Sequence, residues 1–238
     1  MIMSKNLQKE RFDLILKMVK ENDYVKYTDL EKKLNISIAT IRRDVIKLET
    51  QGKLNRISGG IEYRNPNLDE DYHIRSVKYS EKKRVISKKA SKYVKPNTLI
   101  YLDAGTTVFE IISYLKNMNV IVVTNGVEHI NELIKNEISF ILLGGEVKPK
   151  TKAIIGVTAM KQLEQYNFDL AFMGTNAVNE EFGFSTPDIE EAIIKEKAIS
   201  KSQKAIVLAD STKLNNISRV KFADFKDAIL ITEKKENK

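Results

Sequence analysis

The chain has 238 residues, of which 42% are hydrophobic and none is cysteine. The lack of cysteine excludes disulfides and thiolate metal sites, and the lack of a run of about 18 apolar residues predicts no membrane span. The two histidines, His73 and His129, lack the spacing of metal ligands, so we expect no metal ion and no other cofactor. The start has no apolar signal-peptide core, which favours a cytoplasmic protein.

The positive charge is concentrated near the N-terminus. The formal net charge is +8, which suits a polyanionic partner. Residues 1–64 hold 14 Lys and Arg against 9 Asp and Glu, whereas the remaining residues hold 26 against 23. The first quarter of the chain therefore carries most of the excess charge.

Three helices are predicted within the first 50 residues. Apolar residues at helical spacing predict the first over about 6–21. Thr28 and Glu31, at capping-box spacing, predict the start of a short second helix. Ser37 is in position to cap the third helix. Its inward stripe consists of Ile41, Val45 and Leu48. An exposed, basic stripe lies beside it.

This order of helices is typical of a helix-turn-helix motif, whose second helix enters the major groove of DNA. Residues 52–61 add short apolar alternation around a Gly-Gly turn, which predicts a small hairpin, the wing. A three-helix module with a merely solvated basic face is the alternative. The agreement of cap, basic helix and wing favours binding to double-stranded DNA. The predicted DNA-binding residues are Ser37, Thr40, Arg42, Arg43, Lys47 and Arg56.

The segment after the wing is polar and contains proline, so we expect a linker over 65–79 between a DNA-binding domain, 1–64, and a second domain, 80–238. A helix is predicted over about 80–94. Its expected inner face consists of Val85, Ile86, Ala90 and Val94. Its lysines and arginine, at 82–84 and 88–89, could form a phosphate-binding stripe, but a solvated helix face is the favoured interpretation.

The second domain alternates short β-branched runs with helical segments, which predicts an α/β domain with a mostly parallel sheet. The predicted strands are 99–102, 120–123, 140–143, 170–173, 205–208 and 228–231. Ligands bind such sheets at the carboxyl ends of the strands. Small polar residues follow most of these strands, and a helix near the end carries Lys195, Glu196 and Lys197.

The run 103–107, Asp-Ala-Gly-Thr-Thr, ends the first of these strands and opens a helix. Backbone amides at a helix start, beside two threonine hydroxyls, favour an anion such as phosphate. A simple helix cap is the alternative. Taken with the other strand ends, the run predicts a crevice for a small phosphorylated, hydroxylated ligand. The candidate effector-binding residues are Asp103, Gly105, Thr106, Thr107, Thr124, Asn125, Gly144, Gly174, Thr175, Asn176, Lys197 and Lys213.

These motifs together resemble the DeoR family of bacterial repressors over nearly the whole chain. The resemblance rests on the runs 40–44 (Thr-Ile-Arg-Arg-Asp), 56–60 (Arg-Ile-Ser-Gly-Gly), 103–107, 124–125, 144–145 and 210–213 (Asp-Ser-Thr-Lys). The resemblance implies a winged helix-turn-helix followed by a Rossmann-like sensor domain similar to ribose-5-phosphate isomerase and the coenzyme A transferases. It also implies a phosphorylated-sugar effector. Runs 171–176 and 182–188 most resemble repressors of fructose or lactose operons, which implies fructose 1-phosphate, with tagatose 6-phosphate second.

The isomerase resemblance raises the alternative of a sugar-phosphate isomerase with an appended DNA-binding module. Such an enzyme needs a carboxylate base. Where isomerases carry Asp-Gly-Ala-Asp, this chain reads Met-Gly-Thr-Asn over 173–176, and only Glu196 matches the position of the isomerase base. We therefore expect no catalytic residues and a sensor that is not an enzyme. A homodimer or homotetramer would bind the operator, and the effector would lower its DNA affinity.

Overall fold

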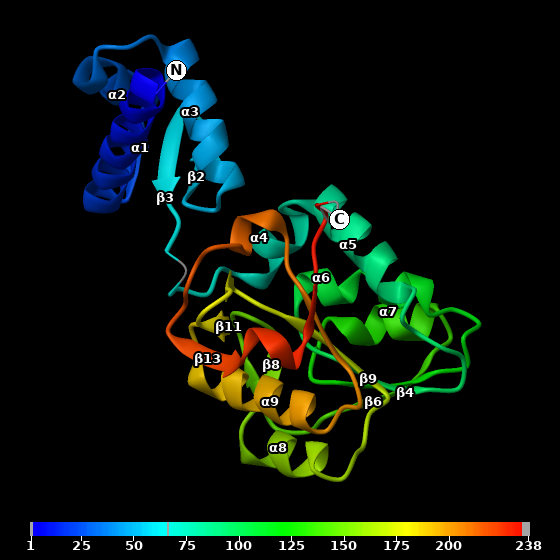
Figure 1. Ribbon diagram of the computed structural model, residues 1–238. Helices are drawn as coiled ribbons and strands as arrows, with labels where there is room; N and C mark the ends of the chain where they lie inside the picture. The colour runs from blue at the N-terminus through cyan, green and yellow to red at the C-terminus, as the bar shows by residue number, and fades with distance from the viewer. Residues whose placement is uncertain (1, 66, 235–238) are drawn as a thin grey trace. The chain divides into compact units, whose positions relative to one another are not determined.

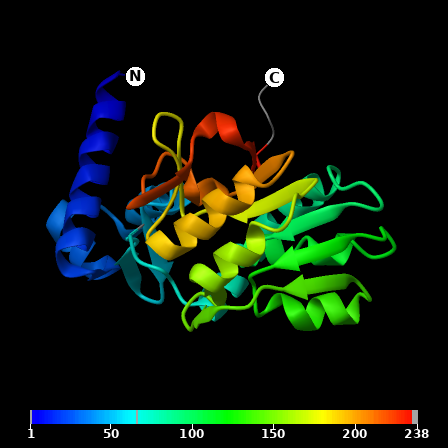
Figure 2. The ribbon, with the colours of Figure 1, turned by 90° about the horizontal axis from the view of Figure 1, so that it is seen from below.

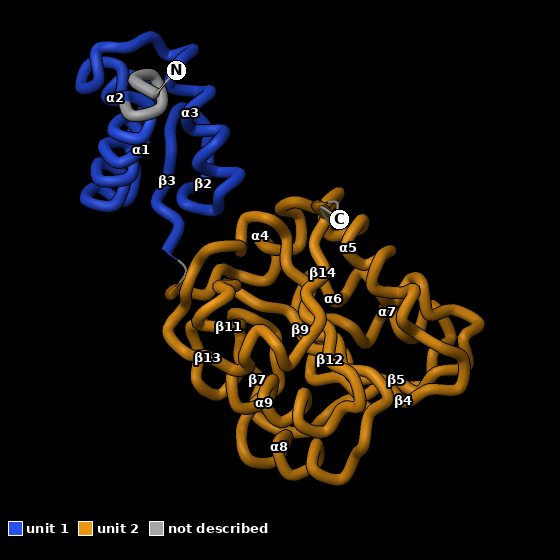
Figure 3. The backbone as a smooth tube through the Cα atoms, viewed as in Figure 1, with its two compact units in different colours: residues 1–65 blue, residues 66–238 orange. Residues whose placement is uncertain are grey.

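The computed structural model describes residues 2–65 and 67–234, and the chain divides into two compact units, 1–65 and 66–238 (Figure 3). Each unit has its own hydrophobic core. Among the described residues, none of the helices has the length and apolar character needed to cross a membrane.

Unit 1 is a small helical module closed by a three-stranded antiparallel sheet. Its elements are α1 (Ile2–Asn22), β1 (Tyr24–Lys26), α2 (Tyr27–Leu34), α3 (Ile38–Thr50), β2 (Leu54–Ile57) and β3 (Gly60–Tyr63). The strand order is β1-β3-β2, so β2 and β3 form the predicted wing. The predicted stripe of α3 is fully buried in the unit's core, where it packs with Ile15 and Leu30.

The entry to the helix-turn-helix differs from the prediction. Ser37 does cap α3, since its side chain accepts a hydrogen bond from the Thr40 amide. The capping box of Thr28 and Glu31 is wrong, because α2 begins at Tyr27 after an N-cap residue with no side-chain bond. The unpredicted strand β1 pairs with β3 and leads directly into α2. A Cβ at Gly60 would lie 2.3 Å from the Val25 carbonyl oxygen, so this sheet requires glycine there.

Unit 2 is built on a six-stranded parallel sheet with helices on both faces (Figures 1 and 2). The strands, in spatial order, are β14 (Ile229–Ile231), β12 (Ala205–Leu208), β9 (Leu170–Gly174), β4 (Leu99–Leu102), β5 (Ile121–Thr124) and β6 (Ser139–Leu142). Every neighbouring pair is parallel. All six predicted strands are present within one residue at each end, and the α/β fold class is confirmed.

Alternate residues of the strands feed two cores, one on each face of the sheet. Ile100 and Leu102 of β4 pack on one side, whereas Tyr101 between them packs on the other. The first core is covered by α5 (Ser80–Ser91), α6 (Thr106–Phe109), the 3-10 turn η1 (Ile112–Tyr114) and α7 (His129–Lys135). The second is covered by α8 (Val157–Leu163) and α9 (Ile189–Ser200). This burial on both faces explains why the strands read as continuous apolar runs.

Several short elements of unit 2 were not predicted. They are α4 (Tyr72–Val77), β7 (Glu146–Lys148), β8 (Ala153–Ile155), β10 (Ala177–Asn179), β11 (Gly183–Thr186), β13 (Val220–Ala223), η2 (Ser211–Lys213) and η3 (Phe225–Asp227). Strands β7 and β8 form a hairpin, and β10, β11 and β13 form a second sheet.

The segment 65–79, predicted as a linker, contains α4. The α4 residue Tyr72 is only 5% exposed, and its amide donates to the Lys150 carbonyl. Asp71 caps the helix by accepting from the His73 amide. The structure thus differs from the linker prediction, because one buried aromatic ring outweighs the polar composition around it.

Helix α5 also differs from the prediction. Val85 is 44% exposed rather than inward, and α5 ends at Ser91, before the buried Val94. Lys83, expected on a solvated face, is 3% exposed, and its ammonium group donates to the Arg75 carbonyl. Lys82 and Lys89 are also bonded, to Ser211 Oγ and to the Thr232 carbonyl respectively. The lysines of α5 are therefore mostly structural partners and not a free charged stripe.

Candidate functional site

The exposed face of α3 carries the predicted DNA-binding residues. Arg42, Arg43 and Lys47 are exposed, while Thr40 is half-buried and its hydroxyl lies 3.1 Å from Ser37 Oγ. Arg43 and Lys47 are four residues apart and share one face of the helix. Because the opposite face is buried in the core, this helix presents its cations outward on a rigid support.

Two of the candidate arginines have partners within unit 1. The Arg42 guanidinium lies 5.6 Å from the centroid of the Tyr27 ring, a cation–π contact. On the wing, Arg56 Nε lies 2.6 Å from Glu49 Oε2, and the Arg56 amide donates to Glu49 Oε1 at 3.1 Å. Glu49 belongs to α3, so this pair ties the wing to the helix. The wing arginine is therefore oriented before any ligand binds.

Asp44 is a structural residue that the sequence reasoning missed. It is 2% exposed, and its carboxylate accepts from Arg11 Nε at 2.8 Å and from Gln8 Nε2 at 3.0 Å. Both donors come from α1, so the contact joins α1 to α3. The signal was an aspartate next to the inward position of Val45, where an acidic group needs a partner.

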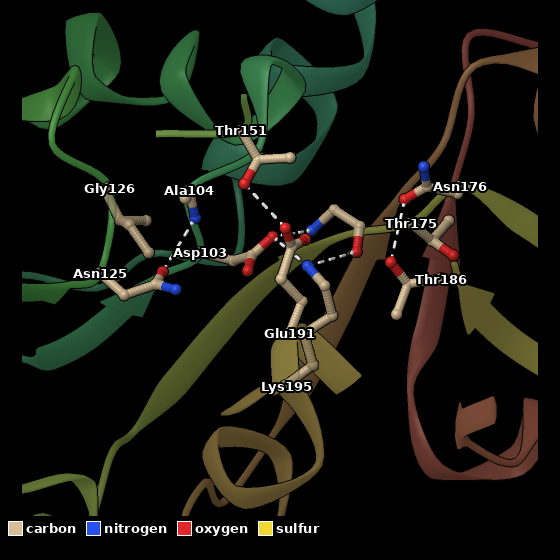
Figure 4. Close-up of polar contacts among 12 residues, drawn as sticks. Asp103, Ala104, Asn125, Gly126, Thr151, Thr175, Asn176, Thr186, Glu191 and Lys195 are labelled. Atoms are coloured by element: carbon tan, nitrogen blue, oxygen red, sulfur yellow. Dashed lines mark hydrogen bonds and ion pairs between the residues drawn. The ribbon is translucent and has the colours of Figure 1, made fainter. Parts of the chain in front are cut away.

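In unit 2, a buried ion pair lies at the carboxyl ends of the two central strands (Figure 4). Asp103 follows β4, and its Oδ2 accepts from Lys195 Nζ at 2.6 Å and from the Gly174 amide at 2.9 Å. Lys195 also donates to the Gly174 carbonyl at 3.2 Å. The side chains of Asp103 and Lys195 are 4% and 6% exposed. A carboxylate and an ammonium group thus meet where parallel sheets bind ligands.

Two glycines keep the backbone close to this pair. A Cβ at Gly174 would lie 3.1 Å from Asp103 Oδ2 and 3.4 Å from the Gly105 Cα. A Cβ at Gly105 would lie 3.3 Å from the Gly174 Cα. The lack of side chains at both positions lets the strand ends of β4 and β9 approach each other around the carboxylate.

Residues after β5 hold the Asp103 turn in place. Asn125 is 1% exposed; its Oδ1 accepts from the Ala104 amide at 3.0 Å, and its Nδ2 donates to the Ile154 carbonyl at 3.1 Å. The Thr124 hydroxyl donates to the Leu102 carbonyl at 2.6 Å. Two of the predicted effector-binding residues therefore support the site from within, because their polar groups are already satisfied by the protein.

His129 is a buried neighbour of the site that the sequence reasoning took only as a surface or structural residue. Its Nδ1 lies 3.0 Å from Thr124 Oγ1. Since that hydroxyl already donates to Leu102, we assign the imidazole proton to Nδ1. Burial lowers the pKa of His129 to about 4, against the weaker opposing effects of the Asp103 charge and the Gly105 backbone. The imidazole is therefore neutral near pH 7.

The other predicted effector residues lie at the same edge of the sheet with differing exposure. Thr106 is 7% exposed and Thr107 is half-buried, both on α6 directly after Gly105. The Thr175 hydroxyl lies 2.8 Å from the Ala177 carbonyl oxygen and 3.1 Å from that of Ser185, and Asn176 Oδ1 accepts from Thr186 at 3.3 Å. Gly144 follows β6, and its amide donates to Gln162 Oε1 at 2.8 Å.

The predicted role of Lys197 has to be corrected. Its Nζ lies 2.9 Å from Glu164 Oε1, on the side of α9 that faces the end of α8. Lys195 reaches Asp103 instead, because residues two apart on a helix point to nearly opposite sides. Glu196, at the position of the isomerase base, is exposed. Of the run Lys-Glu-Lys over 195–197, only Lys195 therefore lies in the site.

A second polar cluster follows β12, the neighbour of β9. Asp210 is 3% exposed and accepts from the Thr212 amide at 2.9 Å. Lys82 Nζ lies 2.8 Å from Ser211 Oγ and 3.2 Å from Glu233 Oε1. Burial lowers the pKa of Lys83 to about 8, although the charge of Asp210 opposes this shift. Lys213, a predicted effector residue, is half-buried at the end of the same turn.

A metal centre has no counterpart in the described ranges, 2–65 and 67–234, where no three His, Asp or Glu side chains gather in a way that could hold an ion. The charged groups at the strand ends are instead paired with cations. What the arrangement offers is a carboxylate, an ammonium group and backbone amides around a close approach of two glycines. Such groups suit a hydroxylated anion.

Comparison with protein families gives two matches that together span most of the chain. Residues 11–67 match the DeoR-like helix-turn-helix domain, and residues 78–234 match the DeoR C-terminal sensor domain. The chain is 44% identical to the HTH-type transcriptional regulator FruR of Bacillus subtilis over 95% of this chain and 91% of that protein. It is 30% identical to a lactose phosphotransferase system repressor of Staphylococcus epidermidis, covering 92% and 88%.

Two solved structures align with part of the chain at low similarity. Ribose 5-phosphate isomerase A of Methanocaldococcus jannaschii aligns with 57% of this chain and 54% of its own, at 21% identity and a TM-score of 0.43. The delta subunit of eIF2B from Chaetomium thermophilum aligns with 68% of this chain and 59% of its own, at 13% identity and a TM-score of 0.48.

Proposed function

This chain belongs to the DeoR family of transcriptional regulators, and from that premise we propose that it is a sequence-specific repressor of a sugar-utilisation operon, controlled by a phosphorylated sugar bound in unit 2. Unit 1 supplies the DNA contacts through the exposed cations of α3 and the wing. Arg42 and Arg43 contact base edges or phosphates in the major groove, and Arg56 contacts the backbone beside it.

The observation that carries the effector proposal is the buried pair of Asp103 and Lys195 beside Gly174. The Asp103 carboxylate accepts hydrogen bonds from sugar hydroxyls. The ammonium group of Lys195 and the amides of Thr106 and Thr107 attract the phosphate. In this proposal Lys213 contributes a further cation, and Thr175 and Asn176 line the crevice.

Fructose 1-phosphate is the proposed effector, with tagatose 6-phosphate as the second candidate. Support comes from the relatives, one of which is named FruR and another a lactose phosphotransferase system repressor. Both sugars carry one phosphate and several hydroxyls, which matches the paired cation and carboxylate of the site.

We propose a sensor and not an enzyme. Isomerisation of a sugar phosphate needs a carboxylate base at the substrate carbon. Glu196 is exposed, and Asp103 already accepts hydrogen bonds from an ammonium group and an amide. Interconversion of hexose or pentose phosphates by the purified chain, abolished in Glu196→Gln, would contradict this choice.

The regulatory mechanism is linkage between the two ligands. A homodimer or homotetramer presents its DNA-binding units to an operator, and the effector binds the operator-free state more tightly. Such coupling typically amounts to about 1–3 kcal/mol. A ligand with equal affinity for both states would shift nothing.

Thermal unfolding with a panel of sugar phosphates tests the proposal. At about 100-fold over its dissociation constant, the true effector stabilises the folded chain by about 2.7 kcal/mol. The matching free sugars serve as controls and should give much smaller shifts. Equal shifts with fructose and fructose 1-phosphate would refute the phosphate assignment.

A further inference from the structure

Helix α9 carries two buried charged side chains on one face, one turn apart. Lys195 is 5% exposed and Glu191 is 8% exposed. Lys195 bonds to Asp103 in the proposed effector site. Glu191 has other partners: its Oε1 accepts from the Thr151 hydroxyl at 2.7 Å (Figure 4). It also accepts from Lys148 Nζ at 3.1 Å. The same rigid helix therefore touches two separate charge clusters.

Lys148, at the end of β7, is shared by three carboxylates. Its Nζ lies 2.6 Å from Asp69 Oδ2, 2.8 Å from Asp188 Oδ2 and 3.1 Å from Glu191 Oε1. Burial lowers the pKa of Lys148, but hydrogen bonds to Asp188 and Asp69 outweigh it and raise the pKa above the usual lysine value. Lys148 therefore stays charged, and its charge is divided among partners from different segments.

Asp69 is the partner that connects this cluster to the DNA-binding unit along the chain. It follows Asn65, the last residue of unit 1, by only four positions. Its side chain is 9% exposed and paired with Lys148. Three residues later, the Tyr72 amide donates to the Lys150 carbonyl. The start of unit 2 is thus attached to the β7–β8 hairpin at two adjacent points.

Asp188 adds a second link from Lys148 to α9. It is the N-cap residue of the helix, and its Oδ1 accepts from the Glu191 amide at 2.9 Å. Lys148 therefore contacts α9 through both its cap and its first turn. A shift of α9 therefore changes two of the three contacts that hold Lys148, and the third contact is Asp69.

We propose that α9 transmits effector binding to the chain segment that leads to the DNA-binding unit, through Glu191, Lys148 and Asp69. The inference rests on the proposed function, since it gives the route by which that effector acts. Lys195 and Asp103 already bond to each other, so a phosphate that attracts the Lys195 ammonium group changes their contact. The change moves α9 and alters the distances from Lys148 Nζ to its three carboxylates. The contact between Lys148 and Asp69 becomes stronger or weaker as a result.

The physical basis is one cation that three carboxylates share. The Lys148 ammonium group has three N–H donors, one for each carboxylate, and its contact with Glu191 is the longest of the three, at 3.1 Å. Movement of α9 changes the contacts with Glu191 and Asp188 but not the position of Asp69, which would give the cluster a second arrangement. An element with two such arrangements can be biased from either side, which is what coupling requires. An ordinary isolated ion pair offers no second arrangement.

The test compares Asp69→Asn and Glu191→Gln with the wild-type full-length chain. Both variants keep shape and leave Lys148 two carboxylates, so both should fold. Glu164→Gln is the matched control, because it also turns a carboxylate into an amide and also breaks an ion pair to α9, that of Lys197. The DNA probe is a duplex selected from a random pool by the wild-type chain, and the effector probe is fructose 1-phosphate, or tagatose 6-phosphate if only that sugar binds.

Two quantities are measured for each protein. One is the melting shift with the sugar phosphate, which reports binding in unit 2. The other is the ratio of operator dissociation constants with and without that sugar phosphate, which reports coupling. We expect Asp69→Asn and Glu191→Gln to retain the melting shift and to reduce the ratio by about 2- to 30-fold. Glu164→Gln should leave both unchanged.

The outcomes separate this inference from the proposed function. A wild-type ratio that survives unchanged in both Asp69→Asn and Glu191→Gln would overturn the route while leaving the repressor proposal intact. An equal reduction of the ratio of operator dissociation constants in Glu164→Gln would also overturn the route, because any ion pair to α9 would then affect coupling. If no sugar phosphate shifts the melting of the wild-type chain, the proposed effector fails first, and the route fails with it.

Discussion

An aspartate is buried against a basic side chain in each unit of the chain, and the pairs of Asp44 and Asp103 have different surroundings. In unit 1, the Asp44 side chain is 3% exposed, while the side chain of its partner Arg11 is 26% exposed and reaches in from the rim. In unit 2, Asp103 and Lys195 are 4% and 6% exposed, so both charges are out of water. Asp44 lies in sequence beside core residues such as Val45, whereas Asp103 lies against Gly105 and Gly174.

The difference shows how one kind of contact serves two purposes. The Asp44 pair fixes α1 on α3, and Asp44 lies next to the core residue Val45. The Asp103 pair lies between two glycines at the edge where parallel sheets bind ligands. In the proposed function, unit 1 therefore acts through exposed cations and unit 2 through a buried one.

The largest expected effect separates the two pairs by stability. Asp103→Asn leaves the buried Lys195 ammonium group without its counter-ion, so we expect a loss of about 3–5 kcal/mol in the free energy of unfolding. Asp44→Asn should cost less, about 1.5–3 kcal/mol, because Arg11 can turn to water. Urea unfolding followed by circular dichroism measures both. Adding Lys195→Met to Asp103→Asn should recover most of the lost free energy of unfolding. Equal losses in Asp103→Asn and Asp44→Asn would contradict the expected difference between the two pairs.

The next largest expected effect is a pH dependence of stability that comes from His129 in unit 2. The pKa of His129 is about 4 in the folded chain, against about 6.5 when unfolded. Between these values the unfolded chain binds a proton that the folded chain does not, so stability is complete above pH 6.5 and falls as pH falls toward 4. The maximum loss is about 3 kcal/mol.

The measurement compares wild type with His129→Asn, whose amide can still donate to Thr124, in urea unfolding from pH 7.5 to 4.5. The variant should lose the part of the acid sensitivity that belongs to the imidazole, while losses due to carboxylates remain in both proteins. Unit 1 contains no histidine, so its own unfolding should lack this dependence. Identical pH profiles for the two proteins would refute the assignment.

The next prediction concerns the exposed cations of unit 1 and uses the substitution Arg43→Ala. Arg43 is exposed on α3, so its loss should leave the fold intact and weaken operator binding by about 1–3 kcal/mol. Lys17→Ala on α1, exposed at 70%, removes the same charge as a control and should have little effect. Fluorescence anisotropy with a labelled duplex measures both. A comparable loss in Lys17→Ala would mean that net charge, and not the α3 surface, determines affinity.

The sequence predicted the two units unequally well. In unit 1, the apolar stripe of α3 and the Ser37 cap are local patterns, and both are confirmed. In unit 2, the six strands were predicted because burial on both faces leaves continuous apolar runs. Lys195 was missed in favour of Lys197 because the choice depends on the phase of α9, which begins at Ile189. The partners of Asp44 were missed because Gln8 and Arg11 lie 36 and 33 residues away in the chain. The partner of Lys83 was missed because the Arg75 carbonyl belongs to α4, in a segment that was predicted as a linker.

The smallest expected effect concerns the wing. Arg56 is paired with Glu49, and their side chains are 46% and 17% exposed, so the pair contributes little to stability. Glu49→Gln releases the guanidinium for a DNA phosphate and removes a negative charge beside it. Operator affinity should therefore rise by about 0.2–1 kcal/mol and fall more steeply with salt. In an Arg56→Ala background the same substitution should give no gain; a gain that persists there would mean that Glu49 repels DNA directly. If the gain in affinity disappears in that background, Arg56 is its cause. DNA then competes with Glu49 for the Arg56 guanidinium at the surface of unit 1, as the sugar phosphate is proposed to compete with Asp103 for Lys195 in unit 2.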